Sequence, residues 1–315
     1  MLKGLALTPP VIGRISIGKV VEKNGKRLPE KDDEFTVTSQ VQVKAGWVSH
    51  PLDETLRKTP TSKLRSIPIR LLFDDPDLNL RANYSLFDRQ TGRPLCVGNG
   101  ETCRRSLAAG VQTLPCPSPE ACELASGGHC KPYGRLNVRI GDDDELGSFV
   151  FRTTGFNSIR TLSARLKYFH AVSGGLLSTL PLELRLRGKS TTQSHRAPIY
   201  YVDLTIKTGM TMADAIASAR AESELRKAAG FDQAALDQAA RQGFAAGAFE
   251  ESEEEGAAVV EEFFPDELEG VSAGTAGMTA IRLGLADKLN QKAEKLNGAS
   301  ASVTLAERHA LPSRN

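Results

Sequence analysis

The sequence predicts an α+β fold, with a mixed or antiparallel β-sheet core, one packed helix and a metal-stapled cysteine-rich loop, followed by a helical, partly disordered C-terminal region. Three observations predict this class. Residues 35–210 contain short runs that alternate apolar and polar side chains, as half-buried strands do. One amphipathic run with a helical period interrupts them near residues 154–175. After Met210 the chain becomes alanine-rich and then acidic.

The clearest strand is expected at residues 35–43, where FTVTSQVQV alternates strictly. Turn sequences such as Asp74-Asp75-Pro76 and Thr91-Gly92-Arg93-Pro94 separate it from later runs. Further strands are expected at residues 66–73, 82–87, 136–140, 148–152, 182–187 and 199–206.

The packed helix is expected to begin at a cap formed by Thr154 or Asn157 and to end at Gly174-Gly175. Its apolar stripe has spacings of three and four residues and consists of Ile159, Leu162, Leu166 and Phe169. Arg160, Arg165 and Lys167 lie off this stripe and are expected to be exposed.

The amino-acid composition of the chain changes at residues 207–210, where we place a domain boundary. Residues 1–207 would form a β-rich, zinc-containing, DNA-associated domain, and residues 208–315 an alanine-rich helical and acidic tail region. Helices are expected over residues 212–248, broken at Gly230 with Asp232 as the next cap, and over residues 278–296.

Charge is distributed unevenly along the chain. Residues 1–207 hold 30 Lys and Arg against 20 Asp and Glu, whereas residues 250–269 hold ten Asp and Glu and no Lys or Arg. This division is typical of a protein whose body binds a polyanion, and we expect DNA as that polyanion. Residues 150–207 carry nine Lys and Arg with interleaved aromatic residues, the composition of surfaces that hold single strands. The predicted DNA contacts are Lys131, Tyr133, Arg135, Arg152, Arg160 and Arg165.

The acidic segment 250–269 contains Val259-Val260 and Phe263-Phe264, which a purely solvating linker does not need. We expect it to be mobile in the free protein, to dock on a partner protein and to compete with DNA for the basic body. The alternative is that the phenylalanines pack on the body as a tether.

No apolar run approaches the 18 or so residues of a membrane span, and the apolar N-terminal run is too short for a signal peptide. We therefore expect a cytoplasmic protein without a membrane partner. Thiols stay reduced in that compartment, so clustered cysteines indicate a metal rather than a disulfide framework.

All five cysteines fall within 35 residues, among glycines and prolines: Cys96, Cys103, Cys116, Cys122 and Cys130. Such a stretch buries little apolar surface, and four thiolates would bind a structural zinc ion that orders it. Five thiols compete for four places, with His129 as a sixth candidate. An iron–sulfur cluster, a redox disulfide and incidental thiols are the alternatives.

Five segments resemble the recombination-directionality-factor-like proteins of phages and integrative elements, some of which are described as hydrolases or metal-binding proteins. They are CVGNGE (96–101), PCPSPEAC (115–122), CKPYGRLNVRI (130–140), GSFVFRTTGFNSIR (147–160) and GGLLSTLPL (174–182). The resemblance spans roughly residues 10–207. It implies that the zinc ligands are Cys96, Cys116, Cys122 and Cys130, with Cys103 as the spare thiol. It also implies a partner, a serine integrase or an annealing recombinase.

Signatures of an enzyme are few. The five histidines form no HExxH pair, and the sequence contains no GxxxxGK[ST] loop and no GxSxG elbow. The carboxylates at 142–145 could hold a hard cation, but a solvated turn is the better interpretation. We therefore expect no catalytic residues and a zinc-stabilised accessory protein of DNA recombination. The alternatives are a single-stranded-DNA-binding protein with an acidic recruiting tail and a metal-dependent hydrolase.

Overall fold

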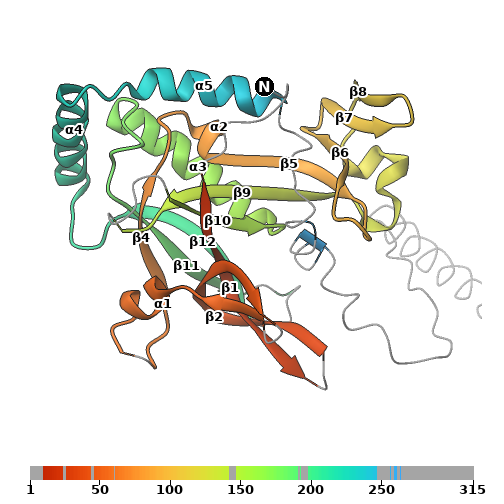
Figure 1. The fold of residues 1–315 in the computed structure, drawn as a ribbon, viewed down its shortest axis with the longest axis horizontal. Helices are drawn as coiled ribbons and strands as arrows, with labels where there is room; N and C mark the ends of the chain where they lie inside the picture. The colour runs from red at the N-terminus through yellow and green to blue at the C-terminus, as the bar shows by residue number, and fades with distance from the viewer. Residues whose placement is uncertain are drawn as a thin grey trace, which may run out of the picture. The chain divides into compact units, whose positions relative to one another are not determined.

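The computed structural model has a mixed α+β fold, in which a large sheet carries the helices (Figure 1). It describes residues 10–23, 26–43, 46–59, 61–141, 147–190, 192, 198–246, 256, 259, 260 and 263, all of which belong to the compact unit Met1–Val271. The predicted turn at 142–145 and the predicted helix at 278–296 lie outside the described residues.

Within the described residues, the main path of the sheet runs in the order β3-β2-β1-β10-β9-β5-β6-β7-β8, and the remaining strands branch from it through β4 and β11. The β1–β10 pair is parallel, and the other pairs between described strands are antiparallel. The strands are β1 (Val11–Lys23), β2 (Lys26–Val43), β3 (Gly46–Ser49), β4 (Ser66–Leu71), β5 (Leu80–Phe87), β6 (Pro94–Gly98), β7 (Thr102–Leu107), β8 (Gly110–Pro115), β9 (Lys131–Arg139), β10 (Ser148–Thr153), β11 (Leu182–Ser190) and β12 (Pro198–Ile206).

Every strand expected from the alternating pattern is present, within β2, β4, β5, β9, β10, β11 and β12. The pattern did not predict β1, because its six Val and Ile residues do not alternate strictly with polar ones. Ile15 lies between Val37 of β2 and Phe151 of β10, and its side chain is buried. Strand-forming residues and pairing on both sides therefore both stabilise β1.

The predicted helix is α3 (Phe156–Ser173), which ends at Gly174 with a positive φ of 73°. Leu162, Leu166 and Phe169 are buried in the main core, as expected. Arg160, Arg165 and Lys167 are exposed, also as expected. The predicted cap is wrong: Gly155 occupies the N-cap position and no side chain caps the helix.

Two further α-helices follow the sheet, α4 (Met212–Ala228) and α5 (Gln233–Ala246), separated at Gly230 as predicted. Asp232 accepts a hydrogen bond from the Ala235 N–H at 2.9 Å, so it caps α5. Ala215 and Ala219 of α4 are buried in the main core, and Ala240 of α5 packs against Phe73. Both helices pack on the sheet-containing body, and the division at residue 207 into two domains stays a prediction.

A buried ion pair joins the short helix α1 (Pro51–Leu56) to β2. Asp53 accepts hydrogen bonds from the Val37 N–H and from Arg57 Nε, both at 2.8 Å. We expect Asp53→Ala to lower the free energy of unfolding by about 3 kcal/mol, because it leaves a buried N–H and a guanidinium without this acceptor. The free energy of unfolding is measured by chemical denaturation, which is followed through the fluorescence of Trp47, the single tryptophan. The exposed neighbour Glu54 provides the control Glu54→Ala. Equal effects of the two substitutions would contradict the role assigned to Asp53.

Candidate functional site

The five cysteines lie on one arm of the molecule, residues 94–130, which we call the cysteine arm. It consists of β6, β7, β8 and two short 3₁₀ helices, η1 (Pro119–Ala121) and η2 (Glu123–Gly128). Figure 1 shows it at the right of the view, beyond the ends of β5 and β9. The sequence pattern indicated a loop here. The structure instead contains three strands, joined by ladders from β5 to β6, β6 to β7 and β7 to β8.

The register of these strands places the first two cysteines on one face. Cys96 pairs with Arg105, and Gly98 pairs with Cys103. Because side chains alternate along a strand, Cys103 and Arg105 point to the face opposite Arg104. The Asn99 side chain accepts hydrogen bonds from the N–H groups of Glu101 and Thr102, both at 2.9 Å, and so shapes the turn between β6 and β7.

The other three cysteines follow on loops that return to this face. The Cys116 N–H donates to the Glu101 carbonyl at 2.8 Å, which fixes the exit from β8. Cys122 lies between η1 and η2, and its carbonyl accepts from the Ala125 N–H at 3.0 Å. Cys130 immediately precedes β9.

All five thiols are electrostatic neighbours. Burial raises the pKa of the Cys130 thiol to about 12, and negative charge on Cys96, Cys122, Cys116 and Cys103 adds to the effect. A Cβ at Gly98 would lie 2.8 Å from both the Cys103 Cβ and the Cys116 Sγ, so only glycine fits between these two side chains.

The thiols share a region without forming a closed ligand set. In the described part of the chain, which includes the whole cysteine arm, no group of three or more His, Cys, Asp or Glu side chains is arranged to hold a metal ion. None of the five cysteines forms a disulfide. The donor set suits zinc in its chemistry, since four of the neighbouring sulfurs would make a tetrathiolate site.

Cys103 differs from the other cysteines in its surroundings. It is the buried one, and its Sγ lies 3.7 Å from the Pro115 carbonyl, to which it donates. Burial, followed by a hydrogen bond with Cys96, raises its pKa to about 11. A thiol that is packed and already bonded to the backbone is poorly placed to become a ligand.

His129 is also engaged elsewhere. Its Nδ1 lies 3.0 Å from Arg89 Nη2. A guanidinium can only donate, so Nδ1 is the acceptor and the proton of the neutral ring lies on Nε2. Its Nδ1 is therefore directed to Arg89.

The predicted DNA contacts do not form a single surface. Tyr133 is 2% exposed and packs edge-on against Phe87, with ring centroids 5.3 Å apart. Arg152 is 8% exposed, and in the β10–β9 register it lies opposite Arg135. Tyr133 is buried by its packing with Phe87 and Phe263, and Arg152 is buried because residues 148–152 of β10 are all covered. A count of basic and aromatic residues does not register such packing.

The other predicted contacts are more accessible, and three of them form contacts within the protein. Arg135 lies over the Tyr133 ring at 5.6 Å, and Lys131 Nζ donates to the Phe263 carbonyl at 2.8 Å. On α3, Arg165 forms an ion pair with Asp203 at 3.0 Å, and Arg160 is exposed.

The contact with Phe263 corrects the expectation that the whole acidic segment is mobile. Val259 and Phe263 are fully buried against Phe87 and Tyr133, and the described residues 256, 259, 260 and 263 are helical. A Cβ on Gly92 would lie 2.3 Å from the Gly256 carbonyl oxygen, so the two glycine backbones touch directly. For these residues the tether alternative is observed.

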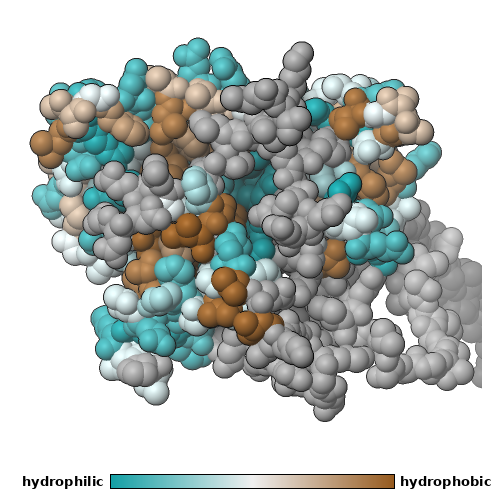
Figure 2. All heavy atoms as spheres, viewed as in Figure 1, coloured by the Kyte–Doolittle hydropathy of each residue, from teal (hydrophilic) through white to brown (hydrophobic). Residues whose placement is uncertain are grey.

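Four large aliphatic side chains are exposed on the cysteine arm, and sequence reasoning did not identify them. Their exposed fractions lie between 39% and 49%, and they are Leu95, Leu107, Val111 and Leu124. Figure 2 shows hydrophobic side chains on the surface of this part of the molecule. Exposed apolar side chains gathered in one region are typical of protein-binding surfaces.

The model of the family described as Gp3-like, recombination directionality factor-like, matches residues 12–207. No curated protein and no solved structure matches the chain. Among the described residues, no helix has both the length and the apolar character needed to cross a membrane.

Proposed function

The chain belongs to the Gp3-like, recombination directionality factor-like family, and from this premise we propose that it is a non-catalytic accessory protein of DNA recombination in the cytoplasm. It would bind a recombinase, either a serine integrase or an annealing recombinase, together with DNA. The observation that carries the proposal is the family match over residues 12–207, which includes the cysteine arm and nearly all of the sheet.

Within this proposal, the cysteine arm is a zinc-stapled recognition element. Zinc would be held by Cys96, Cys116, Cys122 and Cys130, with Cys103 left as a packed thiol. The shared location of the sulfurs, the bond from Cys103 to Pro115 and the engagement of His129 with Arg89 support this choice. The ion would be structural: it would fix the loops of the arm and take no part in chemistry.

The partner of the arm would be a protein. Leu107 and Val111 lie near the tip of the β7–β8 hairpin, on its two opposite faces, and β8 is the last strand of the described path of the sheet. Exposed aliphatic side chains on a strand at the edge of a sheet offer both apolar contact and backbone hydrogen bonds. We therefore assign recombinase binding to this hairpin, and contacts to DNA phosphates to accessible basic side chains such as Arg160.

The test uses the purified full-length chain with a purified serine integrase and a purified annealing recombinase from the same genome. We expect immobilised protein to capture one of them and to change the ratio of excision to integration in a reconstituted reaction. Val111→Glu should weaken capture at least tenfold, because it places a charge in an apolar contact. Biolayer interferometry measures the affinity.

The matched control is Val41→Glu. Val41 is 60% exposed on β2, at the opposite end of the sheet order from β8. We expect it to leave capture unchanged. If the parent protein captures neither recombinase, or if both substitutions weaken capture equally, the proposed function or its surface is wrong.

A further inference from the structure

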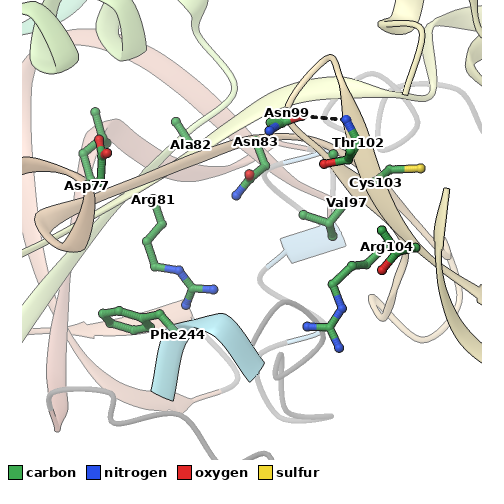
Figure 3. A pocket seen from close by; sticks show the side chains of 13 residues that line it. Asp77, Arg81, Ala82, Asn83, Val97, Asn99, Thr102, Cys103, Arg104 and Phe244 are labelled. Carbon is green, nitrogen blue, oxygen red and sulfur yellow. Dashed lines mark hydrogen bonds between the residues drawn. The ribbon is translucent and has the colours of Figure 1, made fainter. Parts of the chain in front are cut away.

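A cavity of about 480 Å³ lies between the sheet and α5, on the face opposite the paired Cys96 and Arg105. Figure 3 shows Arg81 and Asn83 reaching it from β5, Arg104 from β7, and Phe244 from α5. Its volume falls within the range of roughly 300–1,000 Å³ that is usual for ligand pockets.

The strand registers explain why these side chains meet. Ser85 pairs with Val97, and Val97 pairs with Arg104. Residues two apart on one strand share a face, so Arg81 and Asn83 lie on the same face as Ser85, and hence on that of Arg104. Two cationic side chains therefore converge from strands that β6 separates.

The opposite wall holds one of these arginines in place. The Arg81 guanidinium lies 4.5 Å from the centroid of the Phe244 ring. The Phe244 ring itself packs edge-on against buried Phe73, with centroids 6.1 Å apart. Stacking engages the flat face of a guanidinium, whereas its N–H donors lie in its plane. Arg81 is thereby oriented without losing the donor geometry that suits a phosphate.

The remaining lining is mixed: Asn99, Thr102 and Thr113 are polar, whereas Leu80, Ala82 and Val97 are apolar. Asp77, exposed on the short helix α2 (Pro76–Asn79), is the one acidic residue among the described lining residues. Among the described lining residues, two arginines and one aspartate thus lie beside an aromatic ring and the Asn83 amide.

We propose that this cavity binds one nucleotide of single-stranded DNA, with Arg81 and Arg104 on the phosphate and Phe244 beside the base. A phosphate accepts paired N–H donors from arginine, and an unpaired base packs on an aromatic ring. A base in a duplex cannot enter such a cavity, which favours a single strand. This inference rests on the proposed function, because a role in DNA recombination supplies the single strand. The residues that would contact DNA here differ from those predicted from the sequence.

The test measures binding of a short labelled oligothymidylate to the full-length protein by fluorescence anisotropy over a range of salt concentrations. We expect Arg81→Gln and Arg104→Gln each to weaken binding about tenfold, as loss of a charge-assisted contact does. Each should also reduce the dependence of log affinity on log salt by about 0.7, the contribution of one phosphate of a single strand. Phe244→Leu, which keeps apolar packing against Phe73, should weaken binding at least fivefold.

The matched control is Arg220→Gln, which removes an exposed arginine on α4 and should leave affinity unchanged. Thermal unfolding verifies that each variant is folded. The proposal fails if the parent binds no oligonucleotide, or if the cavity variants behave like the control. If free thymidine monophosphate binds as tightly as the oligonucleotide, the cavity is a site for a free nucleotide and the single-strand proposal is wrong. The proposal is also wrong if the cavity binds an acidic peptide and not DNA. Recombinase capture is measured separately, so failure here leaves the proposed function standing.

Discussion

Replacing Cys122 by serine is expected to reduce bound zinc from about one ion per chain to a trace. Three thiolates hold zinc far more weakly than four, because the lost thiolate supplies both charge and a covalent-like bond. Without the ion the arm between Cys96 and Cys130 should loosen, since its three-stranded ladder buries few large apolar side chains. Elemental analysis measures the metal, and hydrogen exchange of residues 94–130 measures the order of the arm.

Cys103→Ser is the control that distinguishes a thiol that binds zinc from one that only lies near the zinc ligands. Cys103 donates to the Pro115 carbonyl, and a serine hydroxyl can make a similar bond. Zinc content should therefore stay near one ion per chain, as it should in His129→Ala. A parent protein without metal, or zinc loss in the Cys103 variant, would overturn the ligand assignment.

The sheet could largely be predicted from the sequence because several of its strands carry the alternating pattern of a half-buried strand. Residues 35–43 and 182–187 are examples, and both lie in strands. β1 could not be predicted this way, because its Val and Ile residues do not alternate strictly with polar ones. The strands of the cysteine arm were missed for another reason: their ladder, rather than their composition, defines them.

The candidate sites depend on register, which a single sequence does not reveal. The clustering of cysteines in sequence indicated correctly that their thiols would be neighbours. The same reasoning, applied to basic and aromatic residues, selected Tyr133 and Arg152, whose side chains are buried. It passed over Arg81 and Arg104, which only the pairing of β5, β6 and β7 places on one face. Counts of basic and aromatic residues indicate the class of ligand that a protein binds. The pairing of the strands then determines which of these side chains can reach the ligand.

Phe263 is expected to be the main anchor of the acidic segment on the body. Its ring lies 4.9 Å from that of Phe87 and 6.0 Å from that of Tyr133, and its carbonyl accepts from Lys131. Its side chain is fully buried, together with that of Val259 one helical turn earlier. Docking therefore depends on a small apolar cluster beside residues that would otherwise be available to DNA or a recombinase.

We expect Phe263→Ala to weaken this docking by about 3 kcal/mol, the cost of removing a buried phenylalanine. That corresponds to roughly a hundredfold increase in the undocked population, which a Glu-specific protease reports as faster cleavage within residues 250–269. Phe231→Ala is the control, because Phe231 is 46% exposed and packs beside Arg226. Cleavage should accelerate in the first variant and not in the second. Equal rates in the parent and the Phe263 variant would mean that this contact does not hold the segment, and that the acidic tail is available to a partner without first being released.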